Sequence, residues 1–293
     1  MTGLTFVTCV EDEADAAAAH LLVESLRAFG GAPGAGPVLV FSTARAAAAA
    51  VSSRDAEVVS LRTPASLRAL PFGGVVAACA EAETRTPASS LVWVDPRVLV
   101  VRPPALLDLG DEADVAVRPV HVRNVGSPRD DPLDGYWRRV YDAVGLDDTG
   151  LTVESFVDGR RLRAYFNSHV VAVRPGLGLF RRRLEVVERL AADTAFMGGP
   201  YAESVRRVFL FQAVFAALVA ATVAPGRIRI LPADYAYPYN LHAEVAPDRR
   251  PAALDDLVCF AYEGRSLDPD AMGDVAVGEP LRGWLAARRG EVV

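Results

Sequence analysis

The sequence predicts an α/β fold of the Rossmann type, in which helices flank a mixed but largely parallel sheet. In the first half of the chain, short apolar runs typical of buried strands alternate with longer helical segments. Such an alternation is typical of parallel strands joined by right-handed crossovers. The chain has 293 residues, of which 51% are hydrophobic, so it can bury a sizeable core.

The first half of the chain carries the regular alternation. Its expected strands are residues 4–10, 38–41 and 56–61, and its expected helices are 14–29, 43–51 and 72–83. Residues 91–101 then form two apolar runs separated by Asp95-Pro96-Arg97. The first of these runs is typical of a strand buried on both faces.

The second half mixes the two kinds of element less regularly. Its expected strands are 114–122, 165–174, 227–231 and 258–262, its helices 136–144, 177–192, 201–223 and 280–289, and its hairpin 156–162. Residues 124–134 are polar, with Pro and Gly, and are expected to form a mobile cover. We predict a single domain, 1–293, with a nucleotide-binding-type half at 1–118 and an added half at 119–293.

The charge balance argues against a general nucleic-acid surface. Acidic residues outnumber basic ones by 37 to 31, which gives a formal net charge of −6. All of the basic residues are Arg, so no lysine is present to form a Schiff base. Any anion must therefore be held by Arg, by backbone N–H groups or by a metal.

The cysteines and the apolar runs indicate in which cellular compartment the protein is expected. Cys9, Cys79 and Cys259 are far apart and show neither zinc spacing nor a disulfide framework, which fits a reducing cytoplasm. The N-terminal residues show no signal segment. The longest apolar run, 208–224, contains Gln212 and is interpreted as a buried core helix. We therefore expect a cytoplasmic protein with no transmembrane segment.

Asp95 is the first candidate for a functional residue. It falls at the carboxyl end of a predicted strand, where open α/β sheets bind their ligands. Pro96 cannot donate to a sheet ladder and ends the pairing there. A carboxylate at this place can hold a cation, a ribose or an amine; the alternative is an ordinary turn Asp before Pro.

Several segments agree in order with one family of enzymes. They are residues 5–8, 91–101, 106–109, 165–168 and 260–264, together with Phe211-Gln212, Leu231-Pro232 and Tyr239-Asn240. In this ordered set the chain resembles glycosyltransferases of the GT-A fold, in particular the glycogenin and bacterial galactosyltransferase group. The resemblance covers most of the chain and implies a GT-A-like fold. It also implies transfer of a sugar from a nucleotide-sugar donor to an acceptor that the sequence does not name.

The metal site of that family is only partly matched. Its Asp-x-Asp carboxylates hold a divalent metal such as manganese, which neutralises the departing diphosphate. Here Asp95 keeps the first position, but Arg97 stands at the second, and Phe260 or Tyr262 stands where a His ligand is expected. We therefore expect transfer without the usual metal site, with Asp95 as the remaining metal ligand.

The resemblance also implies roles for individual residues. The expected catalytic residues are Asp95, Asn167, His169 and Gln212, and the expected donor-binding residues are Thr8, Val10, Arg97, Asn240 and His242. Thr8 and Val10 would line the nucleobase pocket through backbone groups, and Arg97 would hold the diphosphate. His169 stands where the family usually has Gly, so this residue, His242 and His121 are imidazoles that could join Asp95 in a rebuilt site.

Each of these residues also has a plain structural interpretation. Arg97 could pair with a surface carboxylate. Asn167 could bond a neighbouring strand, and His169 could be a packed, hydrogen-bonded core residue. The rival hypothesis for the whole chain is a GT-A scaffold with a different activity or a non-catalytic binding role.

Overall fold

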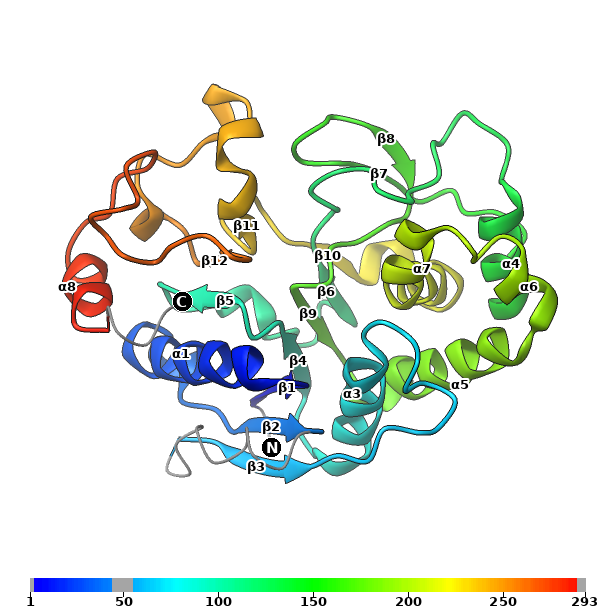
Figure 1. Cartoon of the computed structure of the whole chain (residues 1–293), viewed down its shortest axis with the longest axis horizontal. Coiled ribbons are helices and arrows are strands. Elements are labelled where there is room, and N and C mark those ends of the chain that lie inside the picture. Colours follow the sequence, from blue (N-terminus) through cyan, green and yellow to red (C-terminus); the bar gives the residue numbers. More distant parts are fainter. Residues whose placement is uncertain (1–2, 44–54, 289–293) are drawn as a thin grey trace.

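The protein is built around one twisted mixed sheet, shown in Figure 1 for the whole chain. The computed structural model describes residues 3–43 and 55–288. Within these residues, seven strands lie in the order β10-β6-β9-β4-β1-β2-β3. They are β1 (Leu4–Val10), β2 (Val38–Ser42), β3 (Glu57–Ser60), β4 (Ser90–Val94), β6 (Val115–Val117), β9 (Val170–Val173) and β10 (Ile228–Ile230).

The pairing explains why the sheet is mixed. β1 runs parallel to both β2 and β4, and all of its residues are buried. β9 inserts between β4 and β6 and runs antiparallel to both. The parallel part is the half that the alternating sequence pattern predicted, and the predicted α/β fold with a mixed sheet is confirmed.

Helices cover the two faces of this sheet unequally. Figure 1 shows α1 on one side and α3, α4, α5 and α7 on the other. The helices are α1 (Glu13–Phe29), α2 (Gly31–Gly34), α3 (Gly73–Arg85), α4 (Gly135–Val144), α5 (Leu179–Ala192), α6 (Thr194–Gly198), α7 (Ser204–Thr222) and α8 (Leu281–Ala286). In α1, the side chain of Asp12 caps the helix by accepting the Asp15 N–H at 2.8 Å.

The apolar helix α7 is a core element. By length and composition it could cross a membrane, with a mean hydropathy of 1.6. Its middle, from Leu210 to Val219, is buried, and the helix packs against α4 and α5. Such burial is typical of the core helix of a globular domain, as the sequence analysis predicted.

A second, smaller sheet lies beside α1. In the described chain it has the order β11-β12-β5, with β5 (Val98–Val100), β11 (Tyr237–Pro238) and β12 (Cys259–Ala261). A hairpin of β7 (Thr152–Glu154) and β8 (Arg161–Arg163) is separate. Because β4 belongs to the large sheet and β5 to the small one, residues 95–97 form the corner between the two sheets.

Two predicted strands are much shorter than expected. In place of 114–122 the strand is β6, and in place of 165–174 it is β9. Pro119 has no N–H to donate and makes only an isolated bridge to Phe166. The Oδ1 atom of Asn167 accepts the backbone N–H of His169 at 2.8 Å, which draws this segment away from a ladder. The helix predicted at 43–51 falls on residues 44–54, outside the described chain.

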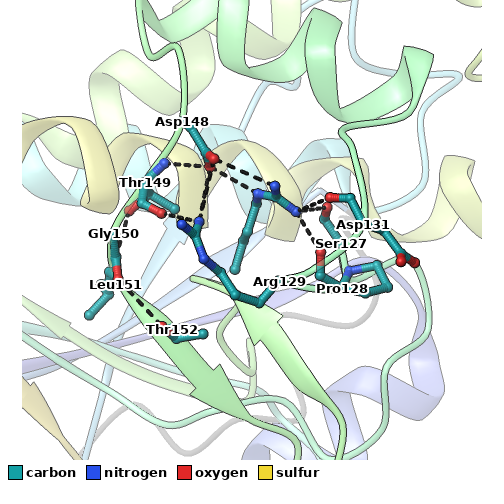
Figure 2. Close-up of polar contacts among 10 residues, drawn as sticks. Ser127, Pro128, Arg129, Asp131, Asp148, Thr149, Gly150, Leu151 and Thr152 are labelled. Atoms are coloured by element: carbon teal, nitrogen blue, oxygen red, sulfur yellow. Dashed lines mark hydrogen bonds and ion pairs between the residues drawn. The ribbon is translucent and has the colours of Figure 1, made fainter.

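The loop at 124–134 is tied down rather than free. The guanidinium of Arg163, only 6% exposed, donates to the Asp131 carbonyl at 2.9 Å, to the Ser127 hydroxyl at 3.1 Å and to the Pro128 carbonyl. The same group pairs with Asp148 at 2.8 Å. Figure 2 shows the groups that accept these hydrogen bonds, Ser127, Pro128, Asp131 and Asp148, together with Arg129, which donates to the Thr149 carbonyl at 2.6 Å. The predicted mobile cover is therefore wrong for most of the loop, because a buried cation holds its carbonyl groups.

Replacing Arg163 should loosen this loop. In Arg163→Met, carbonyls and a carboxylate lose their donor, and unmade buried hydrogen bonds of this kind cost about 2–4 kcal/mol of unfolding free energy. Urea denaturation measures that loss, and hydrogen exchange should speed up in residues 124–134. The matched control is Arg161→Met on the same strand, because Arg161 is exposed and its carboxylate partner Asp130 lies 3.8 Å away. Equal effects of the two changes would contradict the anchoring role of Arg163.

Candidate functional site

Asp95 occupies the corner between the two sheets. It follows the last residue of β4, and its N–H donates to the carbonyl of His169 at 2.8 Å, so it continues the β4–β9 ladder by one step. Its Oδ1 atom accepts the backbone N–H of Arg97 at 2.8 Å, which closes the turn. Burial raises the pKa of this carboxyl, although the nearby His169 and the Arg97 N–H oppose the shift.

The sequence left open whether Arg97 pairs with a carboxylate or faces a ligand site, and its side chain has both a carboxylate partner and access to a cavity. Its Nη1 atom lies 2.6 Å from Oδ1 of Asp15 on α1, so the side chain is paired. The same side chain is 36% exposed and reaches a cavity of about 640 Å³. Burial disfavours the charge of this guanidinium, but Asp15 and Asp95 outweigh burial and raise its pKa.

Six of the predicted site residues meet at this one cavity. They are Asp95, Arg97, Asn167, His169, Gln212 and Asn240. They come from the β4–β5 corner, the segment before β9, helix α7 and the segment after β11. His121, Ser168 and Glu263 lie beside them, and Phe72, Val208, Phe209 and Phe211 form a more apolar part.

A chain of hydrogen bonds fixes the proton positions of the two cavity histidines. The backbone N–H of His169 can only donate, so the atom of Asn167 that accepts it is Oδ1. His169 Nδ1 lies 3.0 Å from the same oxygen and must therefore carry a proton. The Asn167 amide nitrogen then faces Nδ1 of His121 at 3.4 Å, and His121 Nε2 donates to the Ala236 carbonyl at 2.8 Å.

His169 completes the chain as one half of an ion pair. Its Nε2 atom lies 2.6 Å from Oε1 of Glu263. Burial alone would lower the pKa of His169, but Glu263 and then Asp95 outweigh burial and raise it. The hydrogen bond from His169 in turn lowers the pKa of Glu263. Both ring nitrogens of His169 are thus committed, so this residue positions its neighbours rather than exchanging protons with a ligand.

The second imidazole stays neutral. The His121 and His169 rings stack with centroids 5.4 Å apart. Burial, followed by the charges of Arg118 and His169, lowers the pKa of His121 well below its ordinary value. One charged and one neutral ring can stack without repulsion between two cations, which is consistent with the proton positions above.

Three predicted binding residues lie elsewhere in the described structure. The backbone of Thr8 and Val10 is used within the large sheet, where Val10 O accepts the N–H of Thr43 at 3.1 Å. His242 is buried, and its Nδ1 atom lies 2.9 Å from the hydroxyl of Tyr237. His242, which was expected to join Asp95, does not line the cavity, and neither do Thr8 and Val10, which were expected to line a nucleobase pocket.

Glu263 is the cavity residue that sequence reasoning missed as a site group. It has a positive φ of 34°, followed by Gly264 at 81°. Its Oε2 atom accepts the Asn240 amide at 2.5 Å. The remaining Asn240 oxygen is buried without a partner among the described residues. A Glu-Gly pair after a short strand indicates a turn, but only the fold brings it to His169.

The residues at this corner do not suit the divalent metal of the family. Glu263 is paired with His169, Asp15 with Arg97, and one oxygen of Asp95 with the Arg97 N–H. Phe260 is buried in β12 and offers no ligand atom. Among the described residues, no group of three or more His, Cys, Asp or Glu side chains is arranged to hold a metal ion. A hard divalent cation prefers several free oxygens, and this corner offers one carboxylate.

Comparisons with known proteins agree with this architecture. Residues 6–203 match the Rhodobacterales glycosyltransferase domain family. No curated protein sequence matches the chain. The solved structures that are similar to the chain include three whose sequence identity to it is low, so these three show the fold alone.

Two of these structures are of LgtC. The first is an active-site mutant, with a TM-score of 0.54 and 14% identity over 99% of this chain and 96% of that one. The second is the galactosyltransferase LgtC with donor and acceptor sugar analogues, with a TM-score of 0.52 and 17% identity over 98% and 99% of the two chains.

The third structure is the bifunctional glycosyltransferase WbbM, with a TM-score of 0.51 and 12% identity. It aligns with 98% of this chain, and the match spans about half (52%) of WbbM. The family match covers more than half of the present chain, and the fold confirms the GT-A-like architecture that the ordered motifs predicted. The chain belongs to the Rhodobacterales glycosyltransferase domain family and has a GT-A-like fold.

Proposed function

We propose that the protein transfers a sugar from a nucleotide-sugar donor and that Arg97 holds the donor diphosphate in place of the usual metal. The observation that carries the proposal is the position of Arg97, which follows Asp95 at the sheet corner and reaches the cavity. A guanidinium can bind phosphate oxygens through two parallel hydrogen bonds and needs no metal.

The pairing of Arg97 with Asp15 leaves donors for a phosphate. A guanidinium has five N–H groups in a planar fork. The ion pair with Asp15 runs through Nη1. Asp15 therefore orients the guanidinium and sustains its charge, and the rest of the fork is available to a ligand. Asp95, beside it, would bind the ribose hydroxyls of the donor.

The polar groups beyond the corner would bind the sugar. The Ser168 hydroxyl donates to Gln212 Oε1 at 3.0 Å, which fixes the amide of Gln212 at the cavity wall. Asn240 lines the same cavity, where Glu263 accepts its amide N–H and so fixes the position of this side chain. Asn167 and His169 act by positioning Asp95, Glu263 and Asn240 rather than by touching the sugar, because their own polar atoms are already paired.

Two further points belong to the proposal. The three cysteines are free and buried, which supports a reducing, cytoplasmic setting.

The incomplete metal site also supports a second candidate, a GT-A scaffold with a different activity or a non-catalytic binding role. Nucleotide binding and donor turnover distinguish the two candidates.

Replacing Arg97 should weaken nucleotide binding in the absence of metal. Titration calorimetry with UDP, GDP and CDP, in chelator and with manganese, measures the affinity. With the preferred nucleotide, wild-type binding should survive chelator. Arg97→Ala should weaken it by about 1–3 kcal/mol, the usual size of a charge-assisted contact.

Arg102→Ala is the matched control for this experiment. Arg102 lies just beyond β5 and pairs with the half-exposed Asp256 at 3.2 Å, so its loss should leave the affinity unchanged. Binding that requires manganese and ignores Arg97→Ala would contradict the proposed role of Arg97. Tight nucleotide binding with no turnover of any nucleotide sugar would favour the non-catalytic candidate.

The ion pair of His169 and Glu263 should make stability depend on pH in a defined direction. The pKa of His169 is raised above its ordinary 6.5, so its contribution is fully present below about pH 6.5 and is lost as the pH rises through the raised value. The pKa of Glu263 is lowered below 4.5, so its contribution is present above about pH 4.5 and is lost at lower pH. The stability lost in His169→Gln should therefore be largest between these values.

Melting temperatures of wild type and His169→Gln test this at about pH 5.5 and about pH 9. The difference between the two proteins should be larger at the lower pH. His20→Gln is the control, since His20 also faces a glutamate, Glu24, at 3.5 Å but on the exposed side of α1. A difference that grows toward pH 9 would show that His169 is not held as the cation of a buried pair.

A further inference from the structure

One wall of the cavity carries an aromatic side chain that the polar chemistry of the site does not use. Phe72 lies just before α3, lines the cavity and remains 36% exposed. Its ring centroid is 4.6 Å from that of Phe211 on α7, with the two planes at 33°. Phe211 is itself only 6% exposed, so it supports the ring of Phe72 from behind.

The backbone holds Phe72 in place at a conformational cost. Its φ of 60° and ψ of 21° lie in the left-handed region, which is rare for a bulky side chain. A Cβ on the following Gly73 would lie 2.1 Å from the Leu67 carbonyl oxygen, so the loop is pressed tightly against its own backbone. Strain of this kind persists at sites where it serves a ligand, and here it turns a large apolar ring toward the cavity.

We propose that Phe72, supported by Phe211, forms a platform on which the apolar face of a pyranose ring stacks. This inference rests on the proposed sugar transfer and names where the sugar lies. The electron-rich face of an aromatic ring attracts the positively polarised C–H bonds on one face of a pyranose. The hydroxyls at the edge of that pyranose would then face Gln212, which lines the same cavity one residue beyond Phe211.

The arrangement predicts a preference among sugars. Stacking requires a patch of C–H bonds on one side of the pyranose, such as those at C3, C4 and C5 of a galactopyranose ring. The charged corner at Arg97 and Asp95 and the aromatic wall at Phe72 both line this cavity. The stacked ring can belong to the donor or to the acceptor, and the two sources are separated by the probes used.

Saturation-transfer NMR on the full chain tests the platform. The probes are methyl β-D-galactopyranoside for an acceptor-type ring, UDP-galactose for a donor-type ring, and UDP alone. Phe72→Leu keeps an apolar side chain at the same backbone position but removes the ring, whereas Phe72→Tyr keeps the ring. Val205→Ala, at an exposed apolar residue of α7, is the control.

The platform predicts saturation of the pyranose C–H protons in wild type and in Phe72→Tyr. In Phe72→Leu the affinity for the stacked probe should fall roughly three- to tenfold, the size of one aromatic contact, with UDP binding unchanged. Loss for the methyl glycoside alone assigns the acceptor ring, and loss for UDP-galactose alone assigns the donor ring.

Other results overturn the inference. Two results would show that there is no platform. In the first, Phe72→Leu binds both sugar probes as tightly as wild type does; in the second, UDP binds but neither sugar probe shows pyranose contacts. The proposed function stands in both cases. If none of the three probes binds, the platform for these sugars is excluded. Failure to turn over any nucleotide sugar would then count separately against the proposed function. Melting curves of the variants must coincide, so that unfolding does not imitate a loss of binding.

Discussion

The hydrogen bond between the Asp95 N–H and the His169 carbonyl oxygen is the contact on which the rest of the site depends. It extends the β4–β9 ladder by one step and fixes the chain at the point where it leaves the large sheet for the small one. The side chain of Trp93 adds a second tie, because its Nε1 donates to the Ser168 carbonyl at 2.8 Å. The functional side chains on both segments are therefore carried by backbone that cannot shift independently.

Charge is organised around this corner in pairs. Arg97 with Asp15 and His169 with Glu263 each satisfy a partly buried charge, and neutral His121 lies against the second pair. Breaking one partner of such a pair leaves an uncompensated charge, which is more costly than the pair is stabilising. This constraint explains why the site keeps carboxylates and yet has few free oxygens for a metal.

The same logic separates residues that touch a ligand from residues that place others. Asn167 and His169 attract attention in the sequence because they are polar residues in an apolar segment. Their polar atoms are consumed by each other and by His121 and Glu263. Arg97 retains hydrogen-bonding capacity at the cavity, and it is the better candidate for a direct contact with a ligand.

The sequence by itself determined the α/β class, the strand before Asp95 and the motif order typical of a GT-A glycosyltransferase. These features are local. A run of apolar residues is enough to predict a buried strand, and Pro96 ends the strand because it has no N–H. Six residues chosen from motif positions do reach one cavity. The order of the motifs is enough to predict this meeting, because the carboxyl ends of neighbouring strands lie at one edge of a sheet.

Only the tertiary structure decided which groups are free to act. Glu263 lies 94 residues after its partner His169, and nothing local marks the pair. His242 was an equal candidate in sequence, yet Tyr237 takes up its Nδ1 atom. The loop at 124–134 looked mobile because its own residues are polar, but the cation that holds it comes from β8. Hydrogen-bond partners and burial depend on contacts between distant segments, and for that physical reason sequence pattern alone cannot assign them.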